Sequence, residues 1–328
     1  MSRGSAVSES LLRVKNLKTH FRVPRGVVCA VDDISFSLAE GETVGLVGES
    51  GCGKSTLGKS IGRIIRPTSG QVYFKGADIA SLSRRALQPF RKNIQFVFQD
   101  PYSSLNPRAR VQRILEEPLI VHGVRSRKER MDRIAWLVDR VGISREYLSN
   151  FPHEFSGGQR QRIGIARALA LEPQLIICDE PVSALDVSVQ AQVLNLLADI
   201  QKEMRLTSLF ITHDFSVVKY ISDRIMVMYL GKIVEVSEPQ AMWDEPLHPY
   251  TQALISAVPV SNPEMAATKS HFFVTGEIPS QIAPPPGCRF HTRCPEAMKI
   301  CSREEPGLVE LTREGRPRAA VACHLYTL

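Results

Sequence analysis

The stretch "GESGCGKST", Gly48 to Thr56, decides the fold. It continues the apolar start of "TVGLVGES" (43–50), which predicts a buried strand, and it precedes a helical pattern. It matches G-x-x-x-x-G-K-[ST], and this strand–loop–helix context predicts a phosphate-binding loop. We expect Gly48, Gly51 and Gly53 to let consecutive backbone N–H groups face phosphate oxygens, to which the helix N-terminus adds partial positive charge.

Two side chains of this loop have a specific chemistry. We expect Lys54 to reach the β- and γ-phosphates and the Ser55 hydroxyl to bind Mg²⁺. ATP and Mg²⁺ are therefore the predicted ligands. The predicted ATP-binding loop consists of Gly48, Glu49, Ser50, Gly51, Cys52, Gly53, Lys54, Ser55 and Thr56.

A second element is the acidic end of an apolar run, "LIICDE", Leu175 to Glu180. In open α/β sheets, ligands bind at the carboxyl ends of the strands. We expect Asp179 to hold Mg²⁺ through water and Glu180 to polarise the attacking water. Taken alone, the stretch favours an acidic helix cap, but a phosphate-binding loop in the same domain favours the catalytic interpretation.

A third element, "FSGGQRQRIGIARAL", begins at Phe155 and takes a Ser-Gly-Gly-Gln turn into a helix, which is another anion-binding N-terminus. At these residues the chain resembles the ABC-transporter ATPase family, whose signature is L-S-G-G-Q. Phe155 replaces the leucine and keeps an apolar side chain. The resemblance implies that Ser156, Gly157, Gly158 and Gln159 bind the ATP of a facing ATPase domain.

Four further motifs extend the resemblance. Gln99 in "FVFQDP" matches the Q-loop glutamine, which senses Mg²⁺ and the γ-phosphate and contacts the membrane subunits. Ser183 to Asp186 match the D-loop, and His213 in "ITHD" matches the switch histidine at the γ-phosphate. Phe21 in "KTHFRV" resembles the aromatic that stacks on adenine, with a core or edge-strand phenylalanine as the alternative. Glu180, His213 and Gln99 are thus the implied catalytic residues.

Strand and helix patterns alternate along the chain, which predicts an α/β domain with a largely parallel sheet. Further strand candidates are 71–79, 94–100, 174–180, 208–214 and a hairpin over 224–236 that turns at Leu230-Gly231. The resemblance implies a P-loop NTPase of the ABC type, with a parallel RecA-like core, an antiparallel β subdomain and a helical subdomain. We expect an ATPase domain over 1–245, including a helical subdomain at about 101–172, and a C-terminal extension over 246–328.

The branch of the family is indicated by "FVFQDPYSSLNPR" (96–108), "EPVSALDVSVQAQVLNLL" (180–197) and "HPYTQALISAVP" (248–259). They resemble the ATPases of oligopeptide/dipeptide importers, most of all the second of the two ATPase subunits. The resemblance implies an ATP-hydrolysing motor for peptide import, peripheral on the cytoplasmic face of the cell (inner) membrane. Its implied partners are a second related ATPase, two transmembrane permeases and an extracytoplasmic binding protein.

Three alternatives stay open. Nickel importers, and importers of other small solutes, belong to the same branch. A soluble ABC ATPase acting on ribosomes or DNA belongs to another class, but the basic run "RSRKER" (125–130) has no interleaved aromatic residues, so we expect a solvated face and no nucleic acid. A chain that binds ATP without hydrolysing it is disfavoured because Lys54, Gln99, Asp179, Glu180 and His213 are all present. A single motif set requires the chain to pair with itself or with a second ATPase.

Composition restricts the function only weakly. The 328 residues include 43% hydrophobic and 23% charged residues, and the net charge is +7. That excess fits an anionic ligand, a membrane surface, nucleic acid or simply a surface rich in arginine. No apolar run reaches the roughly 18 residues that a membrane span needs. The N-terminus lacks an apolar core segment, so we expect no secretory signal and a reducing compartment.

Four of the seven cysteines lie in the tail, from the end of the Pro-rich stretch 277–288 onward, and this stretch predicts an extended linker. They are Cys288, Cys294, Cys301 and Cys323. The segment around the first two resembles the "C-x-F-x-x-R-C-P" segment of the C-terminal extension of the importer ATPases.

Four thiolates suit either tetrahedral zinc or a four-iron, four-sulfur cluster. No C-x₂₋₄-C pair is present, and Pro295 follows Cys294, so we favour the iron–sulfur (4Fe-4S) cluster, which the resemblance also implies. Zinc and four unrelated thiols are the alternatives, with His291 and His324 as substitute ligands. We expect the metal to hold an extension that has little core of its own.

Overall fold

The computed structural model of the protein describes residues 10–258, 276–311 and 319–326. Residues 1–9, to which the expectation of no secretory signal applies, lie outside the described residues. Residues 259–275 and 312–318 of the predicted extension also lie outside them. The chain divides into two compact units. The first, here the helical unit, comprises Ala39–Glu42 and Leu82–Phe210. The second, here the loop unit, comprises Ser10–Leu38, Thr43–Ser81 and Ile211–Leu328.

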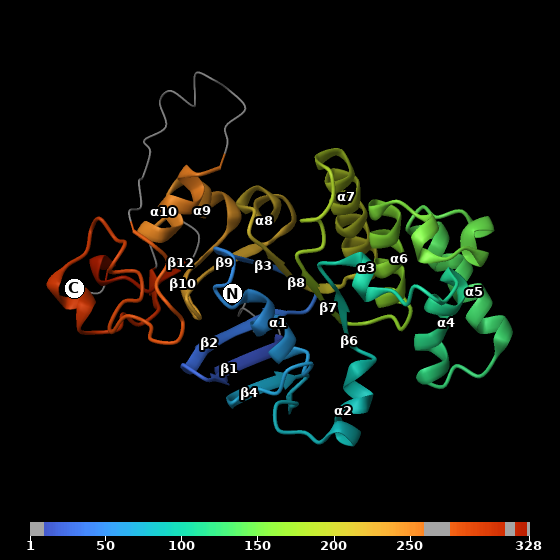
Figure 1. Cartoon of the computed structure of the whole chain (residues 1–328), viewed down its shortest axis with the longest axis horizontal. Coiled ribbons are helices and arrows are strands. Elements are labelled where there is room, and N and C mark those ends of the chain that lie inside the picture. The colour runs from blue at the N-terminus through green and yellow to red at the C-terminus, as the bar shows by residue number, and fades with distance from the viewer. Residues whose placement is uncertain (1–9, 259–275, 312–318, 327–328) are drawn as a thin grey trace, which may run out of the picture. The chain divides into compact units, whose positions relative to one another are not determined.

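The loop unit contains an antiparallel sheet with the strand order β2-β1-β4-β5 (Figure 1, blue). Its strands are β1 (Ser10–Val23), β2 (Gly26–Ala39), β4 (Ser69–Phe74) and β5 (Ala77–Asp78). The single strand predicted over 71–79 is thus a hairpin of two strands. It turns at Lys75 and Gly76, whose φ angles of 49° and 79° are those of a tight reversal.

The unit also holds the consecutive strands β11-β12-β10-β9-β3 of a second sheet. They are β3 (Thr43–Val47), β9 (Arg224–Tyr229), β10 (Lys232–Ser237), β11 (Val309–Leu311) and β12 (Ala319–Val321). The predicted strand β3 is buried at every residue and runs parallel to β9. The predicted hairpin is also present: β9 and β10 are joined by Leu230 and Gly231, which both have positive φ, as a two-residue type I′ turn requires.

Helices complete the loop unit. They are α1 (Lys54–Ile61), α8 (Phe215–Ile221), α9 (Pro239–Asp244) and α10 (Pro249–Ser256), with short 3₁₀ turns at Lys299–Ser302 and His324–Tyr326. Helix α8 packs on β3, and α9 packs on β9 and β10. These helices cover the apolar strands and leave the loop between β3 and α1 at the end of the sheet.

The helical unit contains the parallel pair β6 (Ile94–Val97) and β7 (Leu175–Asp179), followed in the sheet by β8 (Thr207–Thr212), which belongs to this unit up to Phe210. Its helix α6 packs against β6 and against the other helices α3, α4, α5 and α7. Helix α5 begins after Ser126, whose hydroxyl accepts the Glu129 N–H at 3.3 Å. The helices are α2 (Arg84–Arg91), α3 (Pro101–Ser104), α4 (Val111–Val121), α5 (Arg127–Arg140), α6 (Gly157–Leu169) and α7 (Val187–Met204), with 3₁₀ turns at Arg145–Ser149 and Pro152–Glu154. No helix within the described residues is both long and apolar enough to cross a lipid bilayer.

The C-terminal tail is joined to the sheet of the loop unit. Strand β12 pairs antiparallel with β10, and β11 pairs with β12. Beside them, the fully buried ring of Phe290 packs against Tyr229 and Tyr250, with ring centroids 5.2 Å and 5.4 Å away. His248 is the fourth ring of this aromatic cluster. Two segments that are far apart in sequence, 248–250 and 288–295, are thus packed together by one set of rings.

Truncating Phe290 tests whether this cluster holds the tail. We expect Phe290→Ala to lower stability by about 3–5 kcal/mol, because it removes a buried ring and leaves a cavity. Urea unfolding followed by limited proteolysis measures the loss and its position. The control is Ile278→Ala in the Pro-rich stretch 277–288, where the side chain is 51% exposed and little change is expected. Equal effects of the two substitutions would contradict the assignment.

Candidate functional site

The backbone of the loop between β3 and α1 requires its glycines for two different reasons. Gly51 and Gly53 have φ of 78° and 111°, which side chains with a Cβ resist. Gly48 has no such angle, but a Cβ there would lie 2.2 Å from the Met228 carbonyl oxygen. At Gly53 a Cβ would also lie 1.9 Å from the carbonyl oxygen of Ala30. The loop is therefore pressed against neighbouring backbone on both sides.

Lys54 is the first residue of α1 and is buried, and its ammonium lies against its own loop. It donates to the carbonyl oxygens of Gly48 at 2.7 Å and Glu49 at 3.0 Å. The loop also receives outside support, since the Glu49 N–H donates to the Tyr250 hydroxyl and the Gly231 N–H to the Cys52 carbonyl. A fixed ammonium at a helix N-terminus is suited to a polyphosphate.

In the helical unit, the acidic strand end and the predicted Q-loop meet. The Gln99 amide donates to the Glu180 carboxylate at 2.9 Å. Asp179 is buried at the end of β7, next to Cys178, whose pKa is raised to about 12, mainly by burial and then by the Asp179 charge. Glu180 has a φ of 48°, a strained backbone for a residue with a side chain. Such strain is concentrated at functional sites, and here it sets the direction of the chain after β7.

The Ser-Gly-Gly-Gln turn is an N-terminal cap of α6. The Ser156 hydroxyl accepts the Gln159 N–H at 3.3 Å, and the Ser156 N–H donates to the Gln159 side chain at 3.0 Å. This reciprocal capping box fixes the turn. A Cβ at Gly158 would lie 2.4 Å from a methyl carbon of Val189, so the turn packs closely on the start of α7.

The residues around the turn fix it further. Arg160 is buried and donates to the carbonyl oxygens of Pro152 and Phe155, and its guanidinium lies 3.7 Å from the centre of the Tyr102 ring. The predicted D-loop begins at Ser183, whose hydroxyl donates to the Glu180 carbonyl at 3.1 Å. The acidic strand end and the D-loop are therefore one continuous turn.

His213 and Phe21 both have side chains that solvent reaches. His213 directly follows β8 and precedes Asp214, which caps α8. Phe21 lies on β1, an inner strand of its sheet, and is 37% exposed. It is therefore neither a core nor an edge-strand phenylalanine. Its stacking on adenine remains a prediction.

Comparisons with known proteins identify the family to which the chain belongs. Residues 31–183 match the ABC transporter family, and residues 234–301 match the oligopeptide/dipeptide transporter C-terminal region. The oligopeptide transport ATP-binding protein AppF of Bacillus subtilis is 51% identical over 98% of this chain and 99% of its own length. The chain belongs to the ABC-transporter ATP-binding proteins.

Solved structures agree with this assignment. The ATP-binding cassette MJ0796, described as a dimer in a post-hydrolysis state bound to ADP and phosphate, is 31% identical, with a TM-score of 0.64 over 70% of this chain and 98% of that one. The Clostridium perfringens protein cbiO1, part of the transporter complex cbiONQ, is 30% identical, with the same TM-score over 72% of this chain and 91% of that one. The predicted ABC-type fold and ATPase activity are thereby confirmed.

The prediction of a metal cluster in the tail is wrong. Within the described residues, no group of three or more His, Cys, Asp or Glu side chains is arranged to hold a metal ion, and this includes Cys288, Cys294, Cys301 and Cys323. Burial is the largest cause that raises the pKa of Cys288 and of Cys294 to about 11.

Cys323 and Cys301 make contacts within the protein instead. Cys323 packs in an apolar cluster with Leu247 and Val321. The sulfur of Cys301 accepts the Met298 N–H at 3.4 Å. These cysteines therefore contribute to packing, and neither an iron–sulfur cluster nor zinc is supported.

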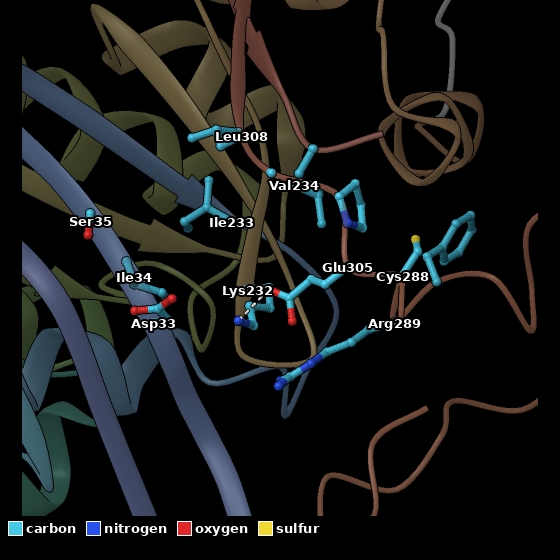
Figure 2. Close-up of a pocket in the computed structure, with 14 residues that line it drawn as sticks. Asp33, Ile34, Ser35, Lys232, Ile233, Val234, Cys288, Arg289, Glu305 and Leu308 are labelled. Carbon is cyan, nitrogen blue, oxygen red and sulfur yellow. Dashed lines mark ion pairs between the residues drawn. The ribbon is translucent and has the colours of Figure 1, made fainter. Parts of the chain in front are cut away.

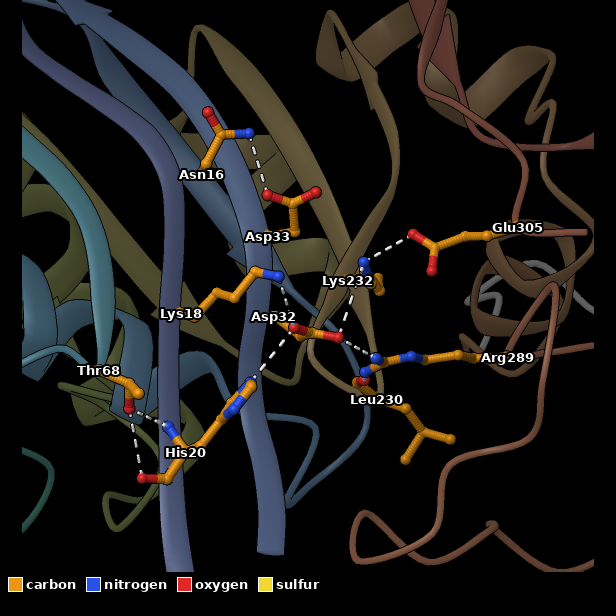
Figure 3. Close-up of polar contacts among 10 residues, drawn as sticks. All are labelled: Asn16, Lys18, His20, Asp32, Asp33, Thr68, Leu230, Lys232, Arg289 and Glu305. Atoms are coloured by element: carbon orange, nitrogen blue, oxygen red, sulfur yellow. Dashed lines mark hydrogen bonds and ion pairs between the residues drawn. The ribbon is translucent and has the colours of Figure 1, made fainter.

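An ion-pair network that the sequence did not predict joins the tail to the antiparallel sheet (Figure 3). Arg289 pairs with Asp32 on β2 and also donates to the Leu230 carbonyl. Lys232 lies 3.8 Å from Asp32 and 2.6 Å from Glu305. Burial acts to raise the pKa of Asp32, but the charges of Lys232 and Arg289 outweigh it and hold that pKa below its usual value. No sequence motif marks this network, because its members come from distant segments.

Beside this network lies a pocket of about 360 Å³ (Figure 2). Its wall combines Asp33, Lys232, Arg289 and Glu305 with apolar side chains such as Leu308. Two acids and two bases balance each other there, so the pocket presents no net charge. It belongs to the interface between β2, β10 and the tail.

The close packing at Gly158 can be tested with a methyl group. Gly158→Ala gains helix propensity of up to about 1 kcal/mol, but the overlap with Val189 costs about 1–3 kcal/mol, so we expect net destabilisation. Chemical unfolding measures the difference. In a Val189→Ala background the overlap is relieved, and the same substitution is expected to be neutral or stabilising. Destabilisation of equal size in both backgrounds would contradict the packing argument.

Proposed function

We propose that this protein is the ATP-hydrolysing motor subunit of an importer of oligopeptides or dipeptides. One observation carries the proposal: a single chain combines an ABC ATPase with the oligopeptide/dipeptide transporter C-terminal region, and it matches AppF over nearly the full length of both. An ATPase subunit does not select the cargo, so the peptide assignment rests on this relationship.

The site residues have the following proposed roles. ATP binds to the loop Gly48–Thr56, with Lys54 on its phosphates and Phe21 on its adenine. Mg²⁺, a cation that prefers oxygen ligands, takes candidate ligands from Ser55, Asp179 and Gln99. Glu180 polarises the attacking water, and its contact with Gln99 supports a shared task. The remaining proposed ATP contacts are His213 and, toward the ATP of a facing domain, Ser156, Gly157, Gly158 and Gln159.

We propose that the ATPase functions together with a second ATPase and with membrane subunits. Its partners are a second related ATPase, two transmembrane permeases and an extracytoplasmic binding protein, and it lies on the cytoplasmic face of the membrane. The ATPase domain spans 1–245 and the extension 246–328. In support, the extension is attached to the loop unit through β12 and the aromatic cluster.

Substitution of Glu180 tests the hydrolytic assignment. We expect Glu180→Gln to lower ATP turnover by about 10²–10⁴-fold, because it removes a general base, and to leave ATP binding intact. Steady-state phosphate release and equilibrium ATP binding measure the two properties separately. Glu172→Gln, at a carboxylate that is 69% exposed, serves as the control. Undiminished turnover in Glu180→Gln would show that the water-polarising role is misassigned.

The cargo is tested in the assembled transporter. ATPase activity of the complex in lipid vesicles is expected to rise several-fold with a peptide-loaded binding protein and to stay at its basal level with nickel. Stimulation by nickel alone would favour the alternative importer of the same branch. Copurification with nucleic acid and without permeases would overturn the transporter assignment.

A further inference from the structure

The extension touches the phosphate-binding loop directly, through Arg293. Its guanidinium forms two parallel hydrogen bonds with the carboxylate of Glu49, at 2.9 Å and 3.1 Å. The same guanidinium donates to the Tyr229 hydroxyl at 3.4 Å. The side chains of Arg293 and Glu49 are only 10% and 26% exposed. A two-point contact of this kind between half-buried groups is specific in direction and strong for an ion pair.

Glu49 occupies a sensitive position. Its carbonyl oxygen accepts the Lys54 ammonium and the Cys52 N–H, and its own N–H is held by the Tyr250 hydroxyl. Its backbone is therefore part of the phosphate-binding loop. Its side chain places a carboxylate in a loop whose ligand is a polyanion. Two like charges at short range repel each other, so an unpaired Glu49 would weaken phosphate binding.

A second residue of the extension, Gln281, contacts the same loop. Gln281, in the Pro-rich stretch, donates its side-chain amide to the Gly51 carbonyl at 2.5 Å and accepts the Cys29 N–H at 3.1 Å with its own carbonyl. The stretch predicted as a linker is thus docked on the loop and on β2. Arg289, four residues before Arg293, is paired with Asp32 on β2 (Figure 3). The guanidinium at Glu49 therefore belongs to a segment that is anchored at two points before it, Gln281 and Arg289.

We propose that Arg293 is a positioning residue of the ATP site, which neutralises Glu49 so that the phosphate-binding loop presents no uncompensated negative charge to ATP. The inference rests on the proposed assignment of ATP phosphates to Gly48–Thr56. It makes ATP affinity depend on the docked extension, a segment that lies outside the recognised ATPase motifs. The competing explanation is that Arg293 only anchors the extension and has no electrostatic effect on ATP.

The first test is equilibrium binding of ATP to Arg293→Ala in the full-length chain. We expect affinity about tenfold lower at low ionic strength, equivalent to about 1.4 kcal/mol. The loss should shrink to a few-fold at about 1 M salt, because ions screen the exposed part of the repulsion. It should be greater for ATP than for ADP, which carries less charge. In hydrolysis assays KM should rise in proportion while kcat changes by less than about twofold.

The decisive comparison removes the negative charge as well. Glu49→Gln combined with Arg293→Ala is expected to bind ATP within about twofold of the unaltered chain, and Glu49→Gln alone at least as tightly as that chain. Arg293→Lys, which keeps the positive charge, is expected to lose less than about threefold. Arg303→Ala, an exposed arginine of the same extension, removes the same charge elsewhere and should have no effect.

The outcomes separate the explanations. If the double variant binds ATP as weakly as Arg293→Ala, or if Arg293→Ala binds normally, the electrostatic proposal is wrong. Arg293→Ala and the double variant both lack the Arg293 side chain that anchors the extension. Any unfolding of the extension would therefore affect both variants, and it cannot explain restored ATP binding in the double variant. Lys54→Ala tests the underlying assignment independently: normal ATP binding in that variant would overturn the proposed role of the loop itself.

Discussion

The architecture depends on how closely the phosphate-binding loop approaches its neighbours. At Gly53 the space left beside the Ala30 carbonyl is too small even for a methyl group, and at Gly48 the same holds beside Met228. A loop confined in this way keeps its N–H groups and the start of α1 in one arrangement. The strands that confine it, β2 and β9, also carry Asp32 and Tyr229, which receive Arg289 and Arg293 of the tail. The position of the loop and the docking of the tail are thus consequences of one packing arrangement.

Local patterns predicted the parts of the fold that bury apolar residues in continuous runs. Strands β3 and β7 are such runs, and the hairpin at Leu230-Gly231 follows from two residues that both accept positive φ. The reversal at Lys75-Gly76 was missed because the strand after it, Ala77–Asp78, is too short to show a pattern of its own. Strands β11 and β12 have three residues each, too few for any periodicity; β12 pairs with β10, and β11 pairs with β12.

The roles of the candidate site residues remain predictions. Motifs with fixed spacing placed Gln99 and Glu180, and the structure brings their side chains into contact. The family resemblance and the ABC fold were confirmed, whereas the metal cluster was not. Cysteine count and spacing do not determine whether the side chains are arranged to hold a metal ion, and within the described residues no such group is present. The pairing of Glu49 with Arg293 was also beyond the sequence, since no rule of spacing relates two residues so far apart in the chain.

The way the tail joins the sheet has a consequence for solubility. Without β12, the outer side of β10 would be an edge with unpaired N–H and C=O groups, and its neighbour β9 is apolar and buried almost throughout. Such an edge is a template for pairing with another chain. The tail moves the edge outward to β11, a strand of only three residues with exposed side chains at Val309 and Glu310. A short, partly charged edge offers little for a second copy to extend, so the extension also acts as a terminating cap for the sheet.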